Sequence, residues 1–150
     1  LLEARSEAGG LALLAASQLA GEDSKTVVVD FFSVIPTAGE TNARGGYDVE
    51  PVEPGLDIAR PTSAEAVRPR MVARQKFMDE LKTLIADYDR AVLMSAPLER
   101  AAYMADALID LEPVVLATAR PGRVTRSGLQ RLLALVSTAR QRDEELLVIC

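Results

Sequence analysis

The chain has 150 residues, of which 49% are hydrophobic and 26% are charged, a composition typical of one globular domain and not of a disordered segment. Its longest apolar runs, around residues 25–32 and 113–119, are far shorter than the roughly 20 residues needed to cross a bilayer, so no membrane-spanning helix is expected. With 22 acidic against 17 basic residues and no histidine, it lacks the positive field of a nucleic-acid-binding protein and the commonest general base and metal ligand of enzymes. No signal-peptide pattern opens the sequence, and we expect a cytoplasmic protein.

The first half of the chain alternates helical and strand-like patterns. Apolar residues at helical spacing predict a helix over residues 9–20, and the run KTVVVDFF over residues 25–32 predicts a strand buried on both faces of a parallel sheet. The proline- and glycine-rich residues 33–69 predict a mobile excursion without long regular elements, in which Tyr47 is the tyrosine most exposed to modification. A helical pattern resumes at Arg70 and ends near Tyr88.

The second half continues the alternation. Strands are predicted over residues 91–94, 113–118 and 146–149, with helices that begin near Leu98 and Thr125. Because such alternation needs crossover connections, we expect an α/β fold with a single open, mostly parallel sheet and helices on both faces, formed by residues 1–150 as one domain. Ligands bind sheets of this kind beyond the carboxyl ends of the strands, so the candidate site lies in the turns that follow them.

Four segments, in this order, resemble the cytoplasmic P-loop domain of the bacterial tyrosine kinases, within the group of ParA- and MinD-like ATPases. The run KTVVVDFF stands where that family has the A-prime motif VLLIDxDxR, and YDRAVLMSAPL is similar to its Walker B segment YDxVIIDxPP. Farther on, EPVVLATARPGRVTRSGLQRLLALV is similar to DgvvlVvrxgxTxxxxLxxaxxxL, and the closing LLVIC stands in place of GvVLN. The resemblance covers nearly the whole chain and implies a P-loop NTPase-like fold and an association with exopolysaccharide assembly.

The resemblance also implies that the nucleotide site is degenerate. Phosphoryl transfer needs a glycine-rich phosphate turn, a lysine, and a hydroxyl and carboxylates on magnesium. The comparison places that turn on residues 6–10, puts Ala8 in the lysine position and puts Ser95 in the position of the Walker B aspartate. Phe32 replaces the second A-prime aspartate, so one carboxylate is retained, and no catalytic residue, nucleotide cofactor or metal is expected. The degenerate positions of the phosphate turn are Ser6, Glu7, Ala8, Gly9 and Gly10, the retained A-prime carboxylate is Asp30, and the Walker B position is Ser95.

Three of these positions have a structural interpretation beside the functional one. Asp30 is either a relic of a metal-binding motif or a strand-end residue that caps the following turn. Gly9 and Gly10 either offer backbone N–H groups to an anion at a helix N-terminus or make a simple tight turn.

The lost residues and the resemblance together favour a catalytically inactive kinase relative that acts as an interaction or scaffold module in bacterial exopolysaccharide biosynthesis or export. Its expected partner is a protein of the membrane polysaccharide assembly machinery, with homo-oligomerisation as a further option. That partner would hold it at the inner face of the membrane without direct membrane insertion. The alternative is an ATP-dependent tyrosine kinase or ATPase with a rewired site, in which Lys25 or Arg123 reaches the phosphates. A spatial regulator of the MinD type would need an amphipathic, membrane-seeking tail, which the sequence does not show.

Overall fold

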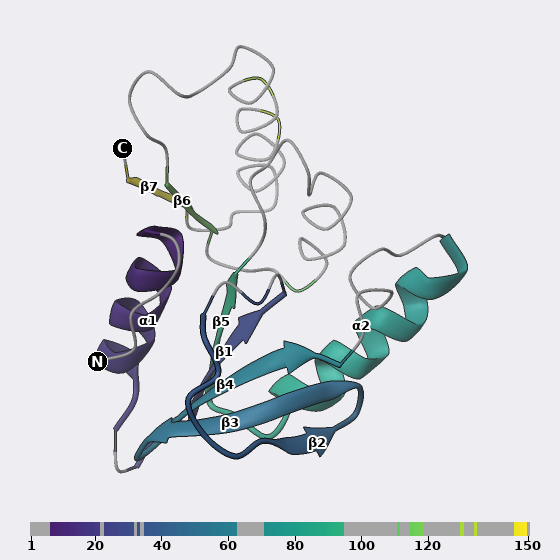
Figure 1. Cartoon of the computed structure of the whole chain (residues 1–150). Helices are drawn as coiled ribbons and strands as arrows, with labels where there is room; N and C mark the ends of the chain where they lie inside the picture. Colours follow the sequence, from purple (N-terminus) through teal and green to yellow (C-terminus); the bar gives the residue numbers. More distant parts are fainter. Residues whose placement is uncertain are drawn as a thin grey trace. The chain divides into compact units, whose positions relative to one another are not determined.

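The chain has an α/β architecture, shown in Figure 1 as a computed structural model. The structure describes residues 7–21, 23–31, 33, 35–62, 71–94, 111, 115–118, 130, 134 and 146–149. Its contacts divide the chain into two compact units, Leu1–Met94 and Ser95–Cys150, and each is described by itself. In the second unit, β6 (Val115–Thr118) and β7 (Leu146–Ile149) pair in parallel. The expectation of one domain over residues 1–150 stays a prediction.

In the first unit, the described residues form an open sheet of five strands in the order β2-β3-β4-β1-β5. The run of β-branched residues forms β1 (Thr26–Asp30), all of whose residues are buried. β4 (Leu56–Pro61) pairs in parallel along one side of β1, and β5 (Arg90–Met94) pairs in parallel along the other. The prediction of a fully buried strand with parallel neighbours is therefore confirmed for this run.

The proline- and glycine-rich region contains β2 (Asn42–Arg44), β3 (Tyr47–Glu53) and β4, which pair as two antiparallel hairpins. The prediction that residues 33–69 hold no long regular element is wrong for residues 42–61. The glycines do not interrupt the strands: Gly45, Gly46 and Gly55 have φ values of 51°, 89° and 79°, as the turns between strands require. Pro51 is exposed and lies beside a register shift, where a strand tolerates proline. The sheet is therefore mixed.

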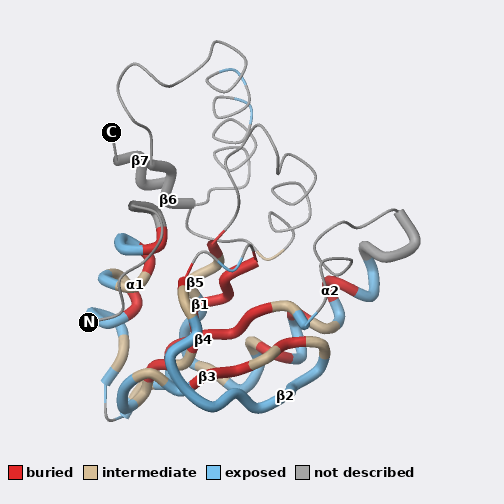
Figure 2. Tube along the Cα trace, in the orientation of Figure 1, coloured by how far each residue is buried: buried red, intermediate tan, exposed pale blue. Residues whose placement is uncertain are grey.

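The exposure expected for Tyr47 is also wrong. Its side chain is 1% exposed and is one of the largest fully buried side chains in the described part of the chain. The error follows from the missed hairpins, because a strand residue that faces the core is buried whatever the composition of the neighbouring turns. Figure 2 shows that buried residues follow β1, β3 and β4 through the centre of this unit.

The two long helices of this unit pack on opposite faces of the sheet. α1 (Glu7–Leu19) places the small side chains of Ala12 and Ala16 in a buried cluster with Ile58 of β4. α2 (Met71–Ile85) approaches the other face, where burial, followed by the charge of Glu80 on this helix, raises the pKa of the Tyr47 phenol. Tyr47 lies opposite Pro61 in the β3–β4 register, so these two side chains face the same side of the sheet. Pro61 is three positions beyond Ile58, and side chains three apart on a strand face opposite sides. Tyr47 therefore faces away from the side on which Ile58 packs against α1. In the described part of the chain, no helix is long and apolar enough to span a membrane.

Candidate functional site

The first turn of α1 lies at the carboxyl edge of the parallel strands, which is the edge that the sequence predicts for the site. The other end of the helix lies near the amino end of β5, where Nη1 of Arg90 donates a hydrogen bond to the carbonyl of Leu19 at 2.7 Å. Nearer its start, Ala12 packs in the same cluster as Met94, the last residue of β5. Thirteen helical residues rise about 20 Å, the length of a short strand, so α1 runs antiparallel to β1 and β5.

The degenerate phosphate positions lie partly in this first turn. Glu7, Ala8, Gly9 and Gly10 are the first four residues of α1, so the two glycines are helical and do not make a tight turn. Gly9 is buried, whereas Gly10 is exposed, and a Cβ built on Gly10 would meet nothing within 4 Å. The structure therefore shows no close approach that requires a glycine at position 10. Ser6, Phe32 and Ser95 lie outside the described residues.

Asp30 ends β1 and is fully buried at the same edge. Its Oδ2 accepts a hydrogen bond from the backbone N–H of Ile35 at 2.7 Å, across the turn that follows the strand. In that turn Ser33 adopts a left-handed φ of 51°, and its N–H lies 3.4 Å from the carbonyl oxygen of Asp30. These contacts confirm the capping interpretation of Asp30, in which the carboxylate satisfies a backbone donor of the turn.

A buried ion pair beside Asp30 was missed by the sequence analysis. Nη1 of Arg60 on β4 lies 2.8 Å from Oε2 of Glu50 on β3, and the two side chains are 7% and 2% exposed. Arg60 also donates from Nε to the carbonyl of Ile35 at 3.3 Å and from Nη2 to the carbonyl of Pro36 at 3.1 Å. The charges stand ten residues apart in a region where no strands were expected. Gly45-Gly46 and Pro54-Gly55 are turn signals that could have predicted the hairpins and placed the two charges on neighbouring strands.

The second oxygen of Glu50 binds the same segment of backbone. Its Oε1 accepts hydrogen bonds from the N–H groups of Ala38 at 2.7 Å and Gly39 at 2.6 Å. Burial acts to raise the pKa of the Glu50 carboxyl, but these N–H groups and the hydrogen bond and charge of Arg60 outweigh it, and the pKa lies below its ordinary value. Glu50 is therefore ionised at neutral pH and holds the backbone that follows Ile35.

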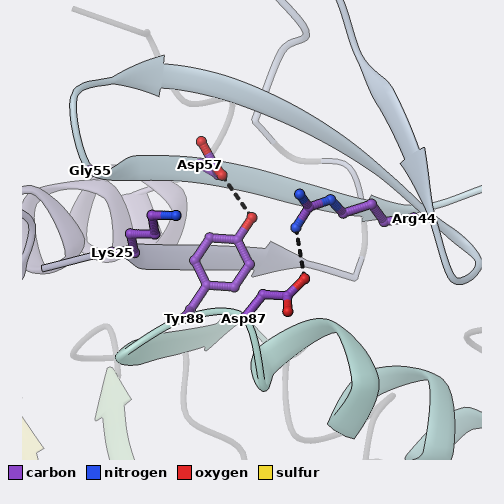
Figure 3. A pocket seen from close by; sticks show the side chains of 6 residues that line it. All are labelled: Lys25, Arg44, Gly55, Asp57, Asp87 and Tyr88. Atoms are coloured by element: carbon purple, nitrogen blue, oxygen red, sulfur yellow. Dashed lines mark hydrogen bonds and ion pairs between the residues drawn. The ribbon is translucent and has the colours of Figure 1, made fainter.

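A shallow pocket of about 350 Å³ lies at the opposite, amino edge of the parallel strands (Figure 3). Within it, the hydroxyl of Tyr88 donates to Oδ2 of Asp57 at 2.7 Å, and Nη1 of Arg44 pairs with Oδ2 of Asp87 at 2.9 Å. Lys25 is the other cation in its lining, and its ammonium makes no ion pair with any of the residues that the structure describes. The two hydrogen-bonded pairs satisfy their own polar groups. The pocket lies at the amino edge, whereas open sheets bind ligands at the carboxyl edge, so it is not the predicted site.

Lys25 does not replace the lost lysine of the phosphate turn. It directly precedes β1, and its carbonyl accepts the N–H groups of Asp89 and Arg90 at 2.9 and 3.2 Å, at the amino edge. The first turn of α1 lies at the other edge, about a helix length of 20 Å away. Arg123, the other cation considered, lies outside the described residues.

The two described tyrosines give a testable pH dependence. Burial, followed by the Glu80 carboxylate, raises the pKa of Tyr47, and burial, followed by the hydrogen bond to Asp57, raises the pKa of Tyr88. A phenol whose pKa is higher in the folded state contributes stability that is complete below its unfolded pKa of about 10 and is lost as the pH rises beyond it. In a Tyr103→Phe background, we expect tyrosinate absorbance to rise only together with the loss of the far-ultraviolet circular dichroism signal.

A Tyr88→Phe substitution in that background serves as the control, because it should halve the absorbance step and leave its coupling to unfolding in place. Ionisation of either tyrosine near pH 10 in a protein that keeps its circular dichroism would contradict the burial of these phenols.

Comparison with protein-family models, with curated proteins and with solved structures finds no match to this chain, and its resemblance to the bacterial tyrosine kinases therefore stays a prediction.

Proposed function

We propose that this chain is a catalytically inactive relative of the bacterial tyrosine kinases that serves as an interaction or scaffold module in exopolysaccharide biosynthesis or export. The proposal includes a P-loop-like, mostly parallel sheet, of which β4, β1 and β5 are part, with the degenerate phosphate positions 7–10 in the first turn of α1. Its partner is a protein of the membrane polysaccharide assembly machinery, which holds it at the inner face of the cell membrane.

The main observation that supports the proposal is the environment of Asp30. Asp30 is the one carboxylate retained from the motifs that the family uses for magnesium. It is buried, and its Oδ2 lies 2.7 Å from the N–H of Ile35. A carboxylate that prepares magnesium-nucleotide for reaction must present oxygen to the ion or to its bound water. The use of this carboxylate as a turn cap supports a structural role.

The chemistry of α1 also supports a binding role in place of catalysis. Residues 8–20 contain no charged side chain, so this part of the helix brings no cation to a phosphate. Leu11, Leu14 and Leu19 are large apolar side chains on the same helix, and they are 41%, 60% and 38% exposed. Exposed apolar side chains on an uncharged helix are typical of surfaces that proteins use to bind one another.

Thermal unfolding in the presence of ATP and magnesium tests the proposal. A ligand at a hundred times its dissociation constant adds about 2.7 kcal/mol to the stability of the protein that binds it. For a chain of this size, each kcal/mol raises the unfolding midpoint by roughly 2–4 °C. We expect no rise at millimolar ATP, because the lysine position holds Ala8 and Asp30 is engaged by the backbone.

The control is the same titration with magnesium alone, which isolates any effect of the ion. A rise that saturates with ATP, supported by heat of binding in isothermal titration calorimetry, would contradict the proposal and favour an ATP-dependent kinase or ATPase.

A further inference from the structure

We propose that residues 35–40 form a strap over the carboxyl edge of the sheet, that Glu50 and Arg60 latch this strap closed, and that its opening withdraws the Ile35 N–H from Asp30 while the sheet stays folded. The strap follows β1 and precedes β2, and the latch residues stand on β3 and β4. The inference goes beyond the proposed function, because it holds whether or not this edge binds a nucleotide.

Charged side chains hold the first part of the strap. The N–H of Ile35 donates to Asp30, and the carbonyls of Ile35 and Pro36 accept from Arg60. Among the described residues, the strap makes no hydrogen bond from its backbone to the backbone of a strand or helix. Its position is therefore set by buried charges and not by the hydrogen bonds of the sheet.

Glu50 holds the second part. Its Oε1 accepts the N–H groups of Ala38 and Gly39, while its Oε2 pairs with Arg60. One carboxylate thus joins the strap to the guanidinium that binds the preceding carbonyls. If Glu50 loses its charge, Arg60 is left as a buried cation without its counter-ion, and water must reach it.

Local opening is the easiest way to admit that water. The outer residues of the strap, 37–40, are exposed, whereas Ile35 is 1% exposed and packs in the cluster that includes Ala12 of α1. The strands beneath keep their own ladders: β3 pairs with β4, and β4 pairs with β1. A segment without ladder hydrogen bonds opens at lower free energy than the sheet on which it lies. The apolar anchor at Ile35 keeps the closed form dominant at neutral pH.

Opening changes what the carboxyl edge presents. In the closed form, Oδ2 of Asp30 accepts the N–H of Ile35 and the residue is 0% exposed. Displacement of Ile35 removes that donor from the carboxylate. The strap therefore sets one of the contacts of an acid at the edge where open α/β sheets bind ligands.

The charged groups around the latch determine how it responds to pH. Besides the latch itself, Asp30 faces it from β1, Asp48 lies opposite Arg60 in the β3–β4 register, and Glu40 belongs to the strap. No charge is added by the described side chains of α1 or by the residues of β5 that follow Arg90. The pKa of Glu50 lies below its ordinary value of 4.5, so the latch is complete above that pH and is lost as the pH falls through the lower folded-state pKa.

Hydrogen exchange measured by mass spectrometry on the full chain tests the strap. We expect Glu50→Gln to raise exchange at the amides of residues 35, 38 and 39 by about tenfold or more, because hydrogen bonds to a charged acceptor are replaced by weaker neutral ones. Amides in the β3–β4 and β1–β4 ladders should keep their protection. Glu53→Gln removes the same charge from an exposed position on β3, and it should leave strap exchange unchanged.

Hydrogen exchange of the wild-type protein at decreasing pH is a second test of the strap. It needs no variant, so it applies even if Glu50→Gln does not fold. After correction for intrinsic exchange, the strap amides should lose protection below pH 4.5 before the sheet amides do. Unchanged strap exchange in Glu50→Gln would overturn the proposal. Parallel loss of strap and sheet protection, in the variant or in acid, would overturn it equally, since the strap would then be part of one cooperative unit. Neither exchange measurement involves ATP. The outcome of the nucleotide experiment therefore does not decide whether the strap opens.

Discussion

A Gly55→Ala substitution is expected to lower the free energy of unfolding by about 3 kcal/mol, because the new side chain would strain a left-handed backbone position and would also collide with neighbouring backbone atoms. Gly55 has a φ of 79°, in the turn between β3 and β4. A Cβ at this position would collide with the carbonyl oxygen of Gly21 and lie 2.9 Å from that of Ser24. Because both neighbours are backbone atoms, they cannot rotate away as a side chain could. The carbonyl of Gly55 also accepts the N–H of Thr26 at 2.7 Å, so a displaced turn would disturb the start of β1.

Gly45→Ala is the matched control. Gly45 has a φ of 51°, but a Cβ built there would meet nothing within 4 Å. Only the cost of the left-handed conformation remains, about 1–2 kcal/mol. Urea denaturation of both variants, followed by circular dichroism, isolates the cost of the backbone contact as the difference between them. Equal losses at the two glycines would mean that the loop before β1 does not lie against the β3–β4 turn.

Truncation of Phe77 to alanine is expected to cost about 3–5 kcal/mol, as for a large aromatic side chain removed from a core. Phe77 is 3% exposed on α2, and its ring centroid lies 5.6 Å from that of Phe31. Phe31 directly follows Asp30, so this contact fixes the end of β1 as well as the position of the helix. Loss of the ring should therefore weaken the carboxyl edge together with the docking of α2.

Leu14→Ala provides the comparison, because Leu14 is a large apolar side chain on a helix but is 60% exposed. Its truncation should change the stability by no more than about 0.5 kcal/mol. Urea denaturation of the full chain measures both variants, and the single variant Phe31→Leu together with the double variant Phe77→Ala/Phe31→Leu gives the coupling between the two rings. A cost below about 1 kcal/mol for Phe77→Ala would contradict the packing of α2 on this face.

The helices and strands that have a local periodicity could be predicted from the amino-acid sequence. KTVVVDFF predicted β1, and helical spacing predicted α1 and α2, with residues 9–20 expected where Glu7–Leu19 is found. The strands β5, β6 and β7 lie within or next to the runs predicted for them, and the α/β class follows from their alternation with helices. Each of these signals is a periodicity carried by neighbouring residues, and burial of the apolar positions reinforces it.

The prediction for residues 33–69 missed the hairpins β2–β3 and β3–β4, because glycine and proline can either end a strand or turn one strand into the next, as Gly45-Gly46 and Pro54-Gly55 do here. Pairing of β3 with β4 buries Tyr47 and brings Glu50 and Arg60 together from positions ten residues apart. The sequence offered two interpretations of Asp30, and the hydrogen bond from Ile35 shows that the carboxylate caps the turn. The partners in these contacts follow from strand register and from the closure of a turn, and both are established only when the chain packs into its tertiary structure.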